Sequence, residues 1–263
     1  MDKVALVTGG SSGIGAACAA MLRDAGWRVF TISRHPFEAE GIRHVCADVT
    51  DEGSVREAVG TILGEAGRVD LLVNNAGFGI SGAIEFTEPQ EARRQFDVNF
   101  FGMVNLCHEL LPAMRKAGGG RIINTSSVAA PVPIPFQAFY SASKAAINSY
   151  TMALANEVRP FGISVCAVMP GDIKTGFTAA RRKCVVGDDV YGGRIERSVK
   201  SMEHDEQTGM PPSAVAKKIV RAAGKKKVKP LYTVGFPYQA AVVLTKLLPA
   251  AALNRMIGMI YAK

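Results

Sequence analysis

The residue pair with the clearest chemical potential is a tyrosine followed four positions later by a lysine. Tyr140 and Lys144 stand among the helix-forming Ala142, Ala145 and Ala146, so we expect both side chains on one face of a helix. A phenol has an ordinary pKa of about 10 and exchanges protons poorly at neutral pH. An ammonium one turn away favours the phenolate, so we expect Lys144 to lower the pKa of Tyr140 and make it an acid–base group. Such a pair by itself is also common on plain helix surfaces.

A glycine-rich segment near the start of the chain has the composition of a phosphate-binding turn. Residues 8–15 read Thr-Gly-Gly-Ser-Ser-Gly-Ile-Gly and follow the strand-like residues 3–7. Glycines let the backbone approach a pyrophosphate closely, and the first amides of the following helix would bind it. The spacing Gly-x-x-x-Gly-x-Gly differs from the dinucleotide motif Gly-x-Gly-x-x-Gly, so a tight turn without a ligand is the alternative.

The end of the second expected strand bears on the choice of cofactor. It reads Thr31-Ile32-Ser33-Arg34 and has no carboxylate, which an NAD site would use to bind the ribose hydroxyls. Ser33 and Arg34 offer a hydroxyl and a guanidinium that suit a 2′-phosphate. We therefore expect NADP(H) to be preferred over NAD(H); a solvated surface charge is the alternative for Arg34.

Strand-like and helical segments alternate along the chain and would position these residues. Apolar runs of strand length occupy residues 3–7, 28–32, 44–47, 70–74, 121–124, 163–168 and 231–234. Helical stretches occupy residues 14–25, 52–65, 89–116, 139–158 and 214–223. Continuous apolar strands are typical of a parallel sheet that is buried on both faces. The pattern predicts an α/β fold, a single doubly wound Rossmann-type domain over 1–263 with a mostly parallel seven-stranded sheet and helices on both faces.

Two segments fall outside this alternation. Residues 175–210 are rich in Arg, Gly and Asp with weak periodicity, and they follow a strand end, where such folds bind ligands. We expect a substrate lid there, with a plain surface excursion as the alternative. Residues 236–263 form an apolar helical extension divided by Pro249, with Lys246, Arg255 and Lys263 as its only charges. Three roles stay open for it: pocket cover, oligomer interface and peripheral membrane contact.

Composition and sequence patterns narrow the possible partners, metal sites and location of the protein. The net charge of +8 would suit nucleic acid, an anionic membrane surface or a phosphorylated cofactor, but no nucleic-acid-binding motif is visible, so we expect no nucleic-acid partner. The five cysteines are scattered without a C-x-x-C pair, and the four histidines lack metal-ligand spacing, so we expect no metal site and a reducing compartment. Without a long apolar run or a signal-peptide pattern, we expect a cytoplasmic protein, with contact at a membrane surface left open.

The chain resembles the short-chain dehydrogenase/reductase family, in its large single-domain branch, over nearly its whole length. Ser127 precedes Tyr140 by 13 positions and Asn99 follows Gly77 by 22, and both spacings are similar to those of that branch. The matching pieces are residues 8–15, Asp48-Val49, Asn74-Asn75-Ala76-Gly77, Asn99, Ser127, the Tyr140-Ser141-Ala142-Ser143-Lys144 run and Pro170-Gly171-Asp172-Ile173-Lys174-Thr175.

The resemblance implies a role for each of four catalytic residues. Tyr140 would be the general acid in carbonyl reduction and the general base in alcohol oxidation. Lys144 would lower the pKa of Tyr140 and hold the nicotinamide ribose. Ser127 would stabilise the charge that develops on the substrate oxygen. Asn99 would hold a water that links Lys144 to solvent; the alternative is that its side chain satisfies the backbone of a bent helix.

The cofactor set combines the glycine turn with the family positions. The resemblance implies that Asp48 contacts the adenine, that residues 75–77 lie beside the ribose, and that Ile173 and Thr175 flank the carboxamide. The full expected set is Gly9, Ser11, Ser12, Gly13, Ile14, Gly15, Ser33, Arg34, Asp48, Val49, Asn75, Ala76, Gly77, Tyr140, Lys144, Pro170, Gly171, Ile173 and Thr175.

The resemblance implies an NADP(H)-dependent oxidoreductase that interconverts a secondary alcohol and a ketone, or a primary alcohol and an aldehyde. Residues 190–196 and the C-terminus loosely resemble the hydroxysteroid and retinol dehydrogenase-like members, which suggests an apolar substrate. The resemblance to the family as a whole implies a homodimer or homotetramer. A non-catalytic NADP(H)-sensing regulator and an enzyme for a small polar carbonyl are the alternatives. Apolar loop residues expected around the substrate, unless they only pack their loops, are Phe78, Ile80, Ile134, Pro135, Phe136 and Phe177.

Overall fold

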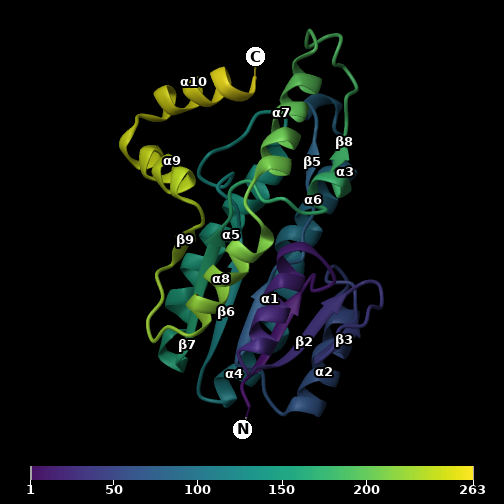
Figure 1. Cartoon of the computed structure of the whole chain (residues 1–263), viewed down its shortest axis with the longest axis vertical. Helices are drawn as coiled ribbons and strands as arrows, with labels where there is room; N and C mark the ends of the chain where they lie inside the picture. Colours follow the sequence, from purple (N-terminus) through teal and green to yellow (C-terminus); the bar gives the residue numbers. More distant parts are fainter. Residues whose placement is uncertain (1, 263) are drawn as a thin grey trace.

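A computed structural model describes residues 2–262, and its centre is a parallel sheet of seven strands (Figure 1). The strands follow the order β3-β2-β1-β4-β6-β7-β9, and every neighbouring pair is parallel. This confirms the predicted doubly wound α/β fold. The strands are β1 (Val4–Thr8), β2 (Arg28–Ser33), β3 (Ile42–Cys46), β4 (Leu71–Asn74), β6 (Gly120–Thr125), β7 (Ile163–Met169) and β9 (Leu231–Thr233).

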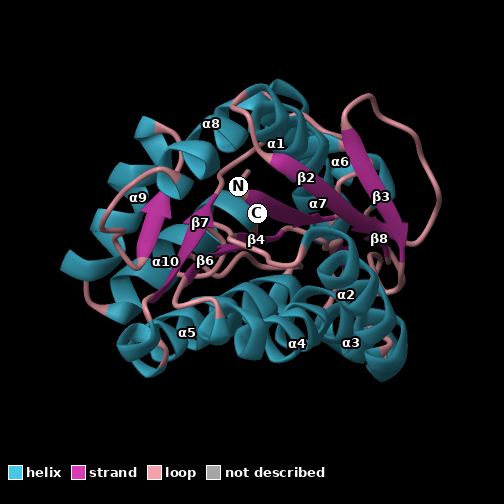
Figure 2. Cartoon of the chain, turned by 90° about the horizontal axis from the view of Figure 1, so that it is seen from below, coloured by secondary structure: helices cyan, strands magenta, loops and turns pink. Residues whose placement is uncertain are grey.

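Helices cover both faces of the sheet (Figure 2). One face packs on α1 (Gly13–Asp24) and α8 (Pro212–Ala223). The other packs on α2 (Glu52–Ala66), α4 (Gly102–Lys116) and α5 (Ala138–Glu157). Because side chains of a strand alternate between faces, Val4 and Leu6 of β1 join the second core and Ala5 and Val7 join the first. The continuous apolar runs of the sequence are therefore the inner strands, which are buried on both sides, whereas the edge strands β3 and β9 are only partly buried.

The long segment at 89–116 is not one uniform α-helix. It consists of α3 (Pro89–Phe96), a π-helical turn η2 (Asp97–Phe101) and α4. A π-turn adds a residue to the helix and turns the side chains after it. Here the turn contains the buried Asn99, which faces the loop after β4.

The segment at 175–210 contains a regular helix that its weak periodicity did not predict. A short helix α6 (Phe177–Ala180) and strand β8 (Arg182–Lys183), which pairs with β5 (Ile80–Ser81), lead to α7 (Arg194–Thr208). The buried face of α7 carries Ile195, Ser198, Val199 and Met202, a spacing of three and four that marks one side of a helix. Because most other positions of α7 are charged or polar, this apolar stripe gives only a weak periodicity in the sequence.

Two helices follow the last strand and extend from the sheet (Figure 1). They are α9 (Phe236–Leu247) and α10 (Ala250–Tyr261), separated at Pro249 as predicted. The guanidinium of Arg194 donates from Nε and Nη2 to the carbonyl of Ala262, at 2.8 and 2.6 Å. The end of α10 is thereby held against the start of α7. In residues 2–262, no helix is both long and apolar enough to cross a membrane.

Candidate active site

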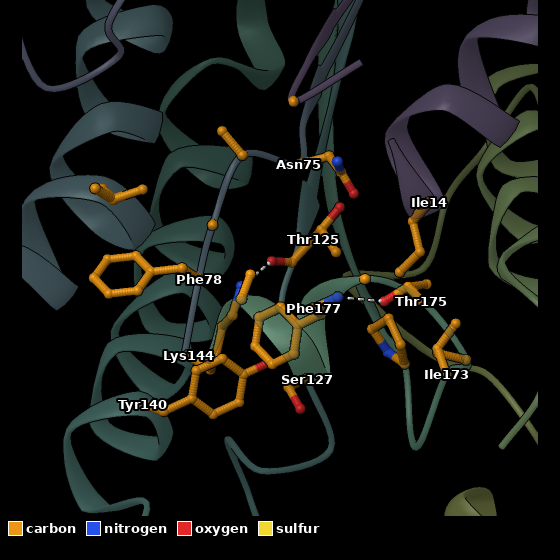
Figure 3. A pocket seen from close by; sticks show the side chains of 18 of the residues that line it. Ile14, Asn75, Phe78, Thr125, Ser127, Tyr140, Lys144, Ile173, Thr175 and Phe177 are labelled. Carbon is orange, nitrogen blue, oxygen red and sulfur yellow. Dashed lines mark hydrogen bonds between the residues drawn. The ribbon is translucent and has the colours of Figure 1, made fainter. Parts of the chain in front are cut away.

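A cavity of about 650 Å³ opens at the carboxyl ends of the strands (Figure 3). A volume of this size suits a small-molecule or cofactor site. Every catalytic and cofactor-binding residue expected from the sequence lines this cavity except Gly15 and Asn99. Neighbouring parallel strands end at one edge of the sheet, so the loops after them bring together residues that are far apart in sequence.

The glycine turn between β1 and α1 has the geometry that its composition predicts. Gly9 and Gly13 adopt positive φ angles of 67° and 54°, which residues with a Cβ rarely adopt. A Cβ on Gly15 would lie 2.1 Å from the carbonyl oxygen of Gly9, so Gly15 is required for packing and lies behind the cavity. Ser12 precedes α1 and its side chain caps no amide, so that side chain leaves the first amides of the helix free to bind an anion.

Asp48, expected at the adenine, lies near two arginines at the rim of the cavity. Burial raises its pKa, but hydrogen bonds from Thr50 and the charges of Arg34 and Arg94 outweigh burial and hold the pKa below its ordinary value. The Thr50 amide and hydroxyl donate to Oδ1 of Asp48 at 2.9 and 2.8 Å. Arg94 was not expected from the sequence. It lies in α3, lines the same cavity and contacts the ring of Phe78, so a second cation accompanies Arg34.

Tyr140 and Lys144 project from α5 into the cavity (Figure 3). The Nζ of Lys144 lies 5.6 Å from the centre of the Tyr140 ring and donates to the carbonyl of Thr125 at 2.9 Å. Burial lowers the pKa of Lys144 to about 8, because removal from water disfavours the charged form. At neutral pH the lysine is still mostly charged and close to titration.

The expected lowering of the Tyr140 pKa is not found in this structure. Burial raises the pKa of Tyr140 to about 12; the hydrogen bond with Ser127 lowers it, but Glu206 and Asp172 add negative charge that raises it. Desolvation of the phenolate is the largest cause of the shift and outweighs the Ser127 hydrogen bond and the charge of Arg181, which both lower the pKa. Tyr140 carries its proton throughout the physiological pH range, which suits a group that donates a proton.

Asn99 lies behind the cavity and holds the loop after β4. Its Oδ1 accepts from the amide of Phe78 at 3.0 Å, and its Nδ2 donates to the Phe78 carbonyl at 3.1 Å and to Ser143 Oγ at 3.2 Å. Gln95, four residues earlier in the helical segment, donates to the same carbonyl at 2.6 Å and accepts from the amide of Ile80 at 2.9 Å. Asn99 thus satisfies backbone groups of the loop after β4 rather than of its own helix, which is compatible with the expected water link from Lys144 to solvent; that link stays a prediction. Gln95 was missed, although its spacing from Asn99 was a usable signal.

Comparison with known proteins identifies the family. The family model for short chain dehydrogenases matches residues 3–185. The chain belongs to the short-chain dehydrogenase family. A 3-ketodihydrosphingosine reductase from Bacteroides thetaiotaomicron is 44% identical over 89% of this chain and 90% of its own length.

Two solved structures of similar proteins contain a nicotinamide cofactor. ElxO with NADP bound is 28% identical, with a TM-score of 0.76 over 91% of this chain and all of that one. A 3-ketoacyl-(acyl-carrier-protein) reductase from Brucella melitensis complexed with NADH is also 28% identical, with a TM-score of 0.75 over 88% of this chain and 96% of that one. Structural neighbours of this dehydrogenase thus bind NADP or NADH.

The substrate end of this dehydrogenase has an apolar and an acidic side. Of the apolar loop residues expected there, Phe78, Ile134 and Phe177 line the cavity. The other three do not: Ile80 is buried in β5, Pro135 is not among the lining residues, and the ring of Phe136 packs against Tyr191.

The acidic side comes from the loop after β7 and from α7, which also contributes Met202. Asp172, Asp205 and Glu206 line the cavity. Glu206 forms a buried ion pair with Arg181, and Asp172 accepts from the Tyr238 hydroxyl at 2.7 Å. Among the described residues Asp205 forms no salt bridge. The sequence did not indicate Asp205 and Glu206 as site residues, because it did not predict α7.

In residues 2–262, no group of three His, Cys, Asp or Glu side chains is arranged to hold a metal ion.

Proposed function

We propose that this dehydrogenase is an NADPH-dependent reductase of a ketone on a long-chain lipid, with Tyr140 as the proton donor. The observation that carries the proposal is the half-buried Tyr140 side chain, protonated and hydrogen-bonded with Ser127, beside the charged Lys144. A protein that only senses a cofactor would not need a proton donor such as Tyr140 next to the Ser127 hydroxyl, which can bind the oxygen of a substrate carbonyl.

The residues of the cavity fit a dinucleotide with a 2′-phosphate. The first amides of α1 would hold the pyrophosphate, and Asp48 would meet the adenine. Arg34 and Arg94 both lie close enough to Asp48 to lower its pKa, so together they supply positive charge where an adenosine ribose carries its 2′-phosphate. When bound, NADPH supplies the hydride.

Residues of this chain would bind the oxygen of the substrate carbonyl and supply the proton that this oxygen receives. The hydroxyls of Ser127 and Tyr140 would donate hydrogen bonds to the carbonyl oxygen as negative charge develops on it. Tyr140 then breaks its O–H bond and gives the proton to that oxygen, which becomes the alcohol. The phenolate that remains lies beside the Lys144 ammonium, whose position is fixed by its bond to Thr125. Lys144 would therefore stabilise the phenolate that forms when Tyr140 gives up its proton.

The acidic side of the cavity supports an amino ketone as the substrate. 3-Ketodihydrosphingosine, named in the 44% identical relative, carries a protonated amine on the carbon next to its ketone, followed by a long alkyl chain. Asp205, which lines the cavity and has no ion-pair partner among the described residues, would face such an ammonium, and the apolar side would take the chain. A steroid or retinoid, the other lipid class expected, is uncharged and would gain nothing from this carboxylate.

Tyr140→Phe tests the proton donor. We expect the variant to bind NADPH with unchanged affinity and to lose at least about a thousandfold in kcat, within the range attributed to general acid catalysis. Tyr150→Phe, on the same helix but packed against the core, is the matched control and should turn over normally. Undiminished turnover by Tyr140→Phe would refute the mechanism.

Asp205→Asn tests the substrate class. Its KM should rise about tenfold for a long-chain α-amino ketone and stay unchanged for the same ketone without the amine, because only the first presents a charge to the carboxylate. Asp189→Asn changes an exposed aspartate outside the cavity and is the control. An equal effect on both ketones would reject the amino ketone while leaving the reductase proposal intact.

A further inference from the structure

The positive charge of this protein is concentrated in its C-terminal part. After Glu206 the chain contains ten lysines and arginines and no aspartate or glutamate. The net charge of the whole chain is +8, so the residues up to Glu206 are slightly acidic and the last part carries the entire excess. Within the C-terminal helices, Lys246 and Arg255 are both exposed. The other described basic residues of this part stand at 217–229, in α8 and the segment after it. A partner for the C-terminal helices must therefore accommodate the charges of Lys246 and Arg255 and finds no acidic side chain on either helix.

The same helices leave an unusual amount of apolar surface uncovered. No residue of α9 is buried, and Ile257 is the only buried residue of α10. Phe236, Val243 and Leu247 of α9 are 83%, 55% and 73% exposed. Their spacing of seven and four puts them on one face of the helix. On α10, Met259 and Ile260 are exposed to a similar degree.

Parts of both C-terminal helices reach the catalytic cavity. Tyr261 at the end of α10 lines the cavity, and Tyr238 of α9 holds Asp172. The loop at 184–193, between β8 and α7, lies at the same end of the molecule (Figure 1). It exposes Val185, Val186 and Val190. Of the twelve large apolar side chains found exposed among the described residues, eight thus lie in α9, α10 and this loop rather than being scattered singly over the surface.

We propose that α9 and α10 form an interfacial membrane-binding face that docks on bilayers containing anionic phospholipid. Amphipathic helices bind such surfaces by burying apolar side chains at the level of the headgroups while basic residues meet the lipid phosphates. A second copy of this chain is a poorer occupant, because a symmetric contact between these helices would join two surfaces that each carry Lys246 and Arg255 and no acidic residue of either helix. The loop at 184–193 would reach the same surface.

The docked orientation has a consequence for the substrate, which rests on the proposed function. A lipid ketone leaving the bilayer would pass Tyr261 and enter the cavity without crossing water. The protein would then reduce a lipid ketone embedded in a membrane more efficiently than the same ketone dispersed in water.

Sedimentation with vesicles tests the docking and needs no turnover. We expect the full chain to bind vesicles of phosphatidylcholine with about one-third phosphatidylglycerol at least tenfold more tightly than vesicles of phosphatidylcholine alone. Val243→Glu/Leu247→Glu, at exposed positions that the fold does not need, should lose this binding. Lys246→Gln/Arg255→Gln should weaken it by about fivefold per charge removed.

Met152→Glu/Phe161→Glu places the same charges on exposed apolar residues of α5 and η3 (Arg159–Phe161), outside the C-terminal helices, and should bind vesicles like the wild type. All variants should reduce a short, water-soluble ketone normally. Reduction of a long-chain ketone presented in vesicles should fall only in the two variants of α9 and α10.

Two results would overturn the proposal. One is no sedimentation of the wild type with either vesicle. The other is a dimer, seen by light scattering, that Val243→Glu/Leu247→Glu converts to a monomer while vesicle binding is absent or unchanged, which would make this face an interface between copies. A protein that binds vesicles but reduces no ketone would refute the proposed function and leave the docking intact.

Discussion

Replacing the buried lysine by an uncharged side chain of similar shape should make this protein more stable and inactive at the same time. Lys144 is almost fully buried, and its ammonium has one protein partner shown by hydrogen bonding, the Thr125 carbonyl. Burial lowers its pKa from 10.5 to about 8, so folding disfavours the charge that the proposed mechanism uses. Lys144→Met removes the charge and keeps most of the packing.

The size of the effect follows from the pKa. Each pKa unit corresponds to about 1.4 kcal/mol, so holding the charged lysine costs about 3 kcal/mol of folding free energy. This cost is complete below pH 8, where the folded and unfolded chains both bind the proton. Between pH 8 and 10.5 the folded protein releases the proton first, so the cost shrinks as the pH rises and is nearly gone at the upper end.

The hydrogen bond to Thr125 opposes this gain. Its loss costs about 1 kcal/mol, so Lys144→Met should exceed the wild type by about 2 kcal/mol at pH 7 and lose that advantage by pH 10. Urea unfolding followed by circular dichroism at pH 7, 8, 9 and 10 measures the difference directly. Turnover of a ketone with NADPH should fall below detection in the variant.

An exposed lysine provides the control. Lys226→Met lies in the basic segment after α8 and should show a stability difference from the wild type that does not change over the same pH range. The reasoning is wrong if Lys144→Met is less stable than the wild type at pH 7, or if the difference between them is the same at pH 7 and pH 10. Either result would mean that burial does not penalise the Lys144 charge.

Two further predictions concern the cofactor end of the cavity. Arg34→Ala should weaken NADPH binding at least tenfold and NADH binding less than twofold, measured by fluorescence titration; equal losses would show that Arg34 does not meet the 2′-phosphate. Gly15→Ala should destabilise the protein by about 2 kcal/mol or more and abolish NADPH binding, because the new Cβ would clash with the Gly9 carbonyl oxygen. Gly64→Ala, in α2 where a Cβ meets nothing within 4 Å, should instead stabilise by about 0.5–1 kcal/mol in the same urea experiment; a loss there, or tolerance at Gly15, would contradict the geometry.

The sequence alone determined the features that depend on short spacings along the chain. Four positions between Tyr140 and Lys144 place both on one side of any helix, and the glycines at 9, 13 and 15 define a turn that no neighbouring segment needs to specify. Buried parallel strands are apolar on both sides, so the strand pattern and the doubly wound fold were predictable. The order of the parallel strands then brought the expected site residues to one edge.

What the sequence missed are properties set by distant neighbours. Gln95 and Arg94 matter because α3 lies against the loop after β4. Asp205 matters because a helix with a weak apolar stripe packs beside the cavity. Neither relation can be deduced from local spacing, because each depends on where two separate elements meet.

The protonation of Tyr140 is the clearest example of a property that only the folded structure decides. Spacing predicted a lysine close enough to lower the pKa of Tyr140, and the two side chains do lie together. The direction of the shift was nevertheless wrong, because burial is its largest cause and the carboxylates of Glu206 and Asp172 raise the pKa further. A sequence specifies which charges are near in the chain, whereas the loss of water around them is decided only by the folded structure.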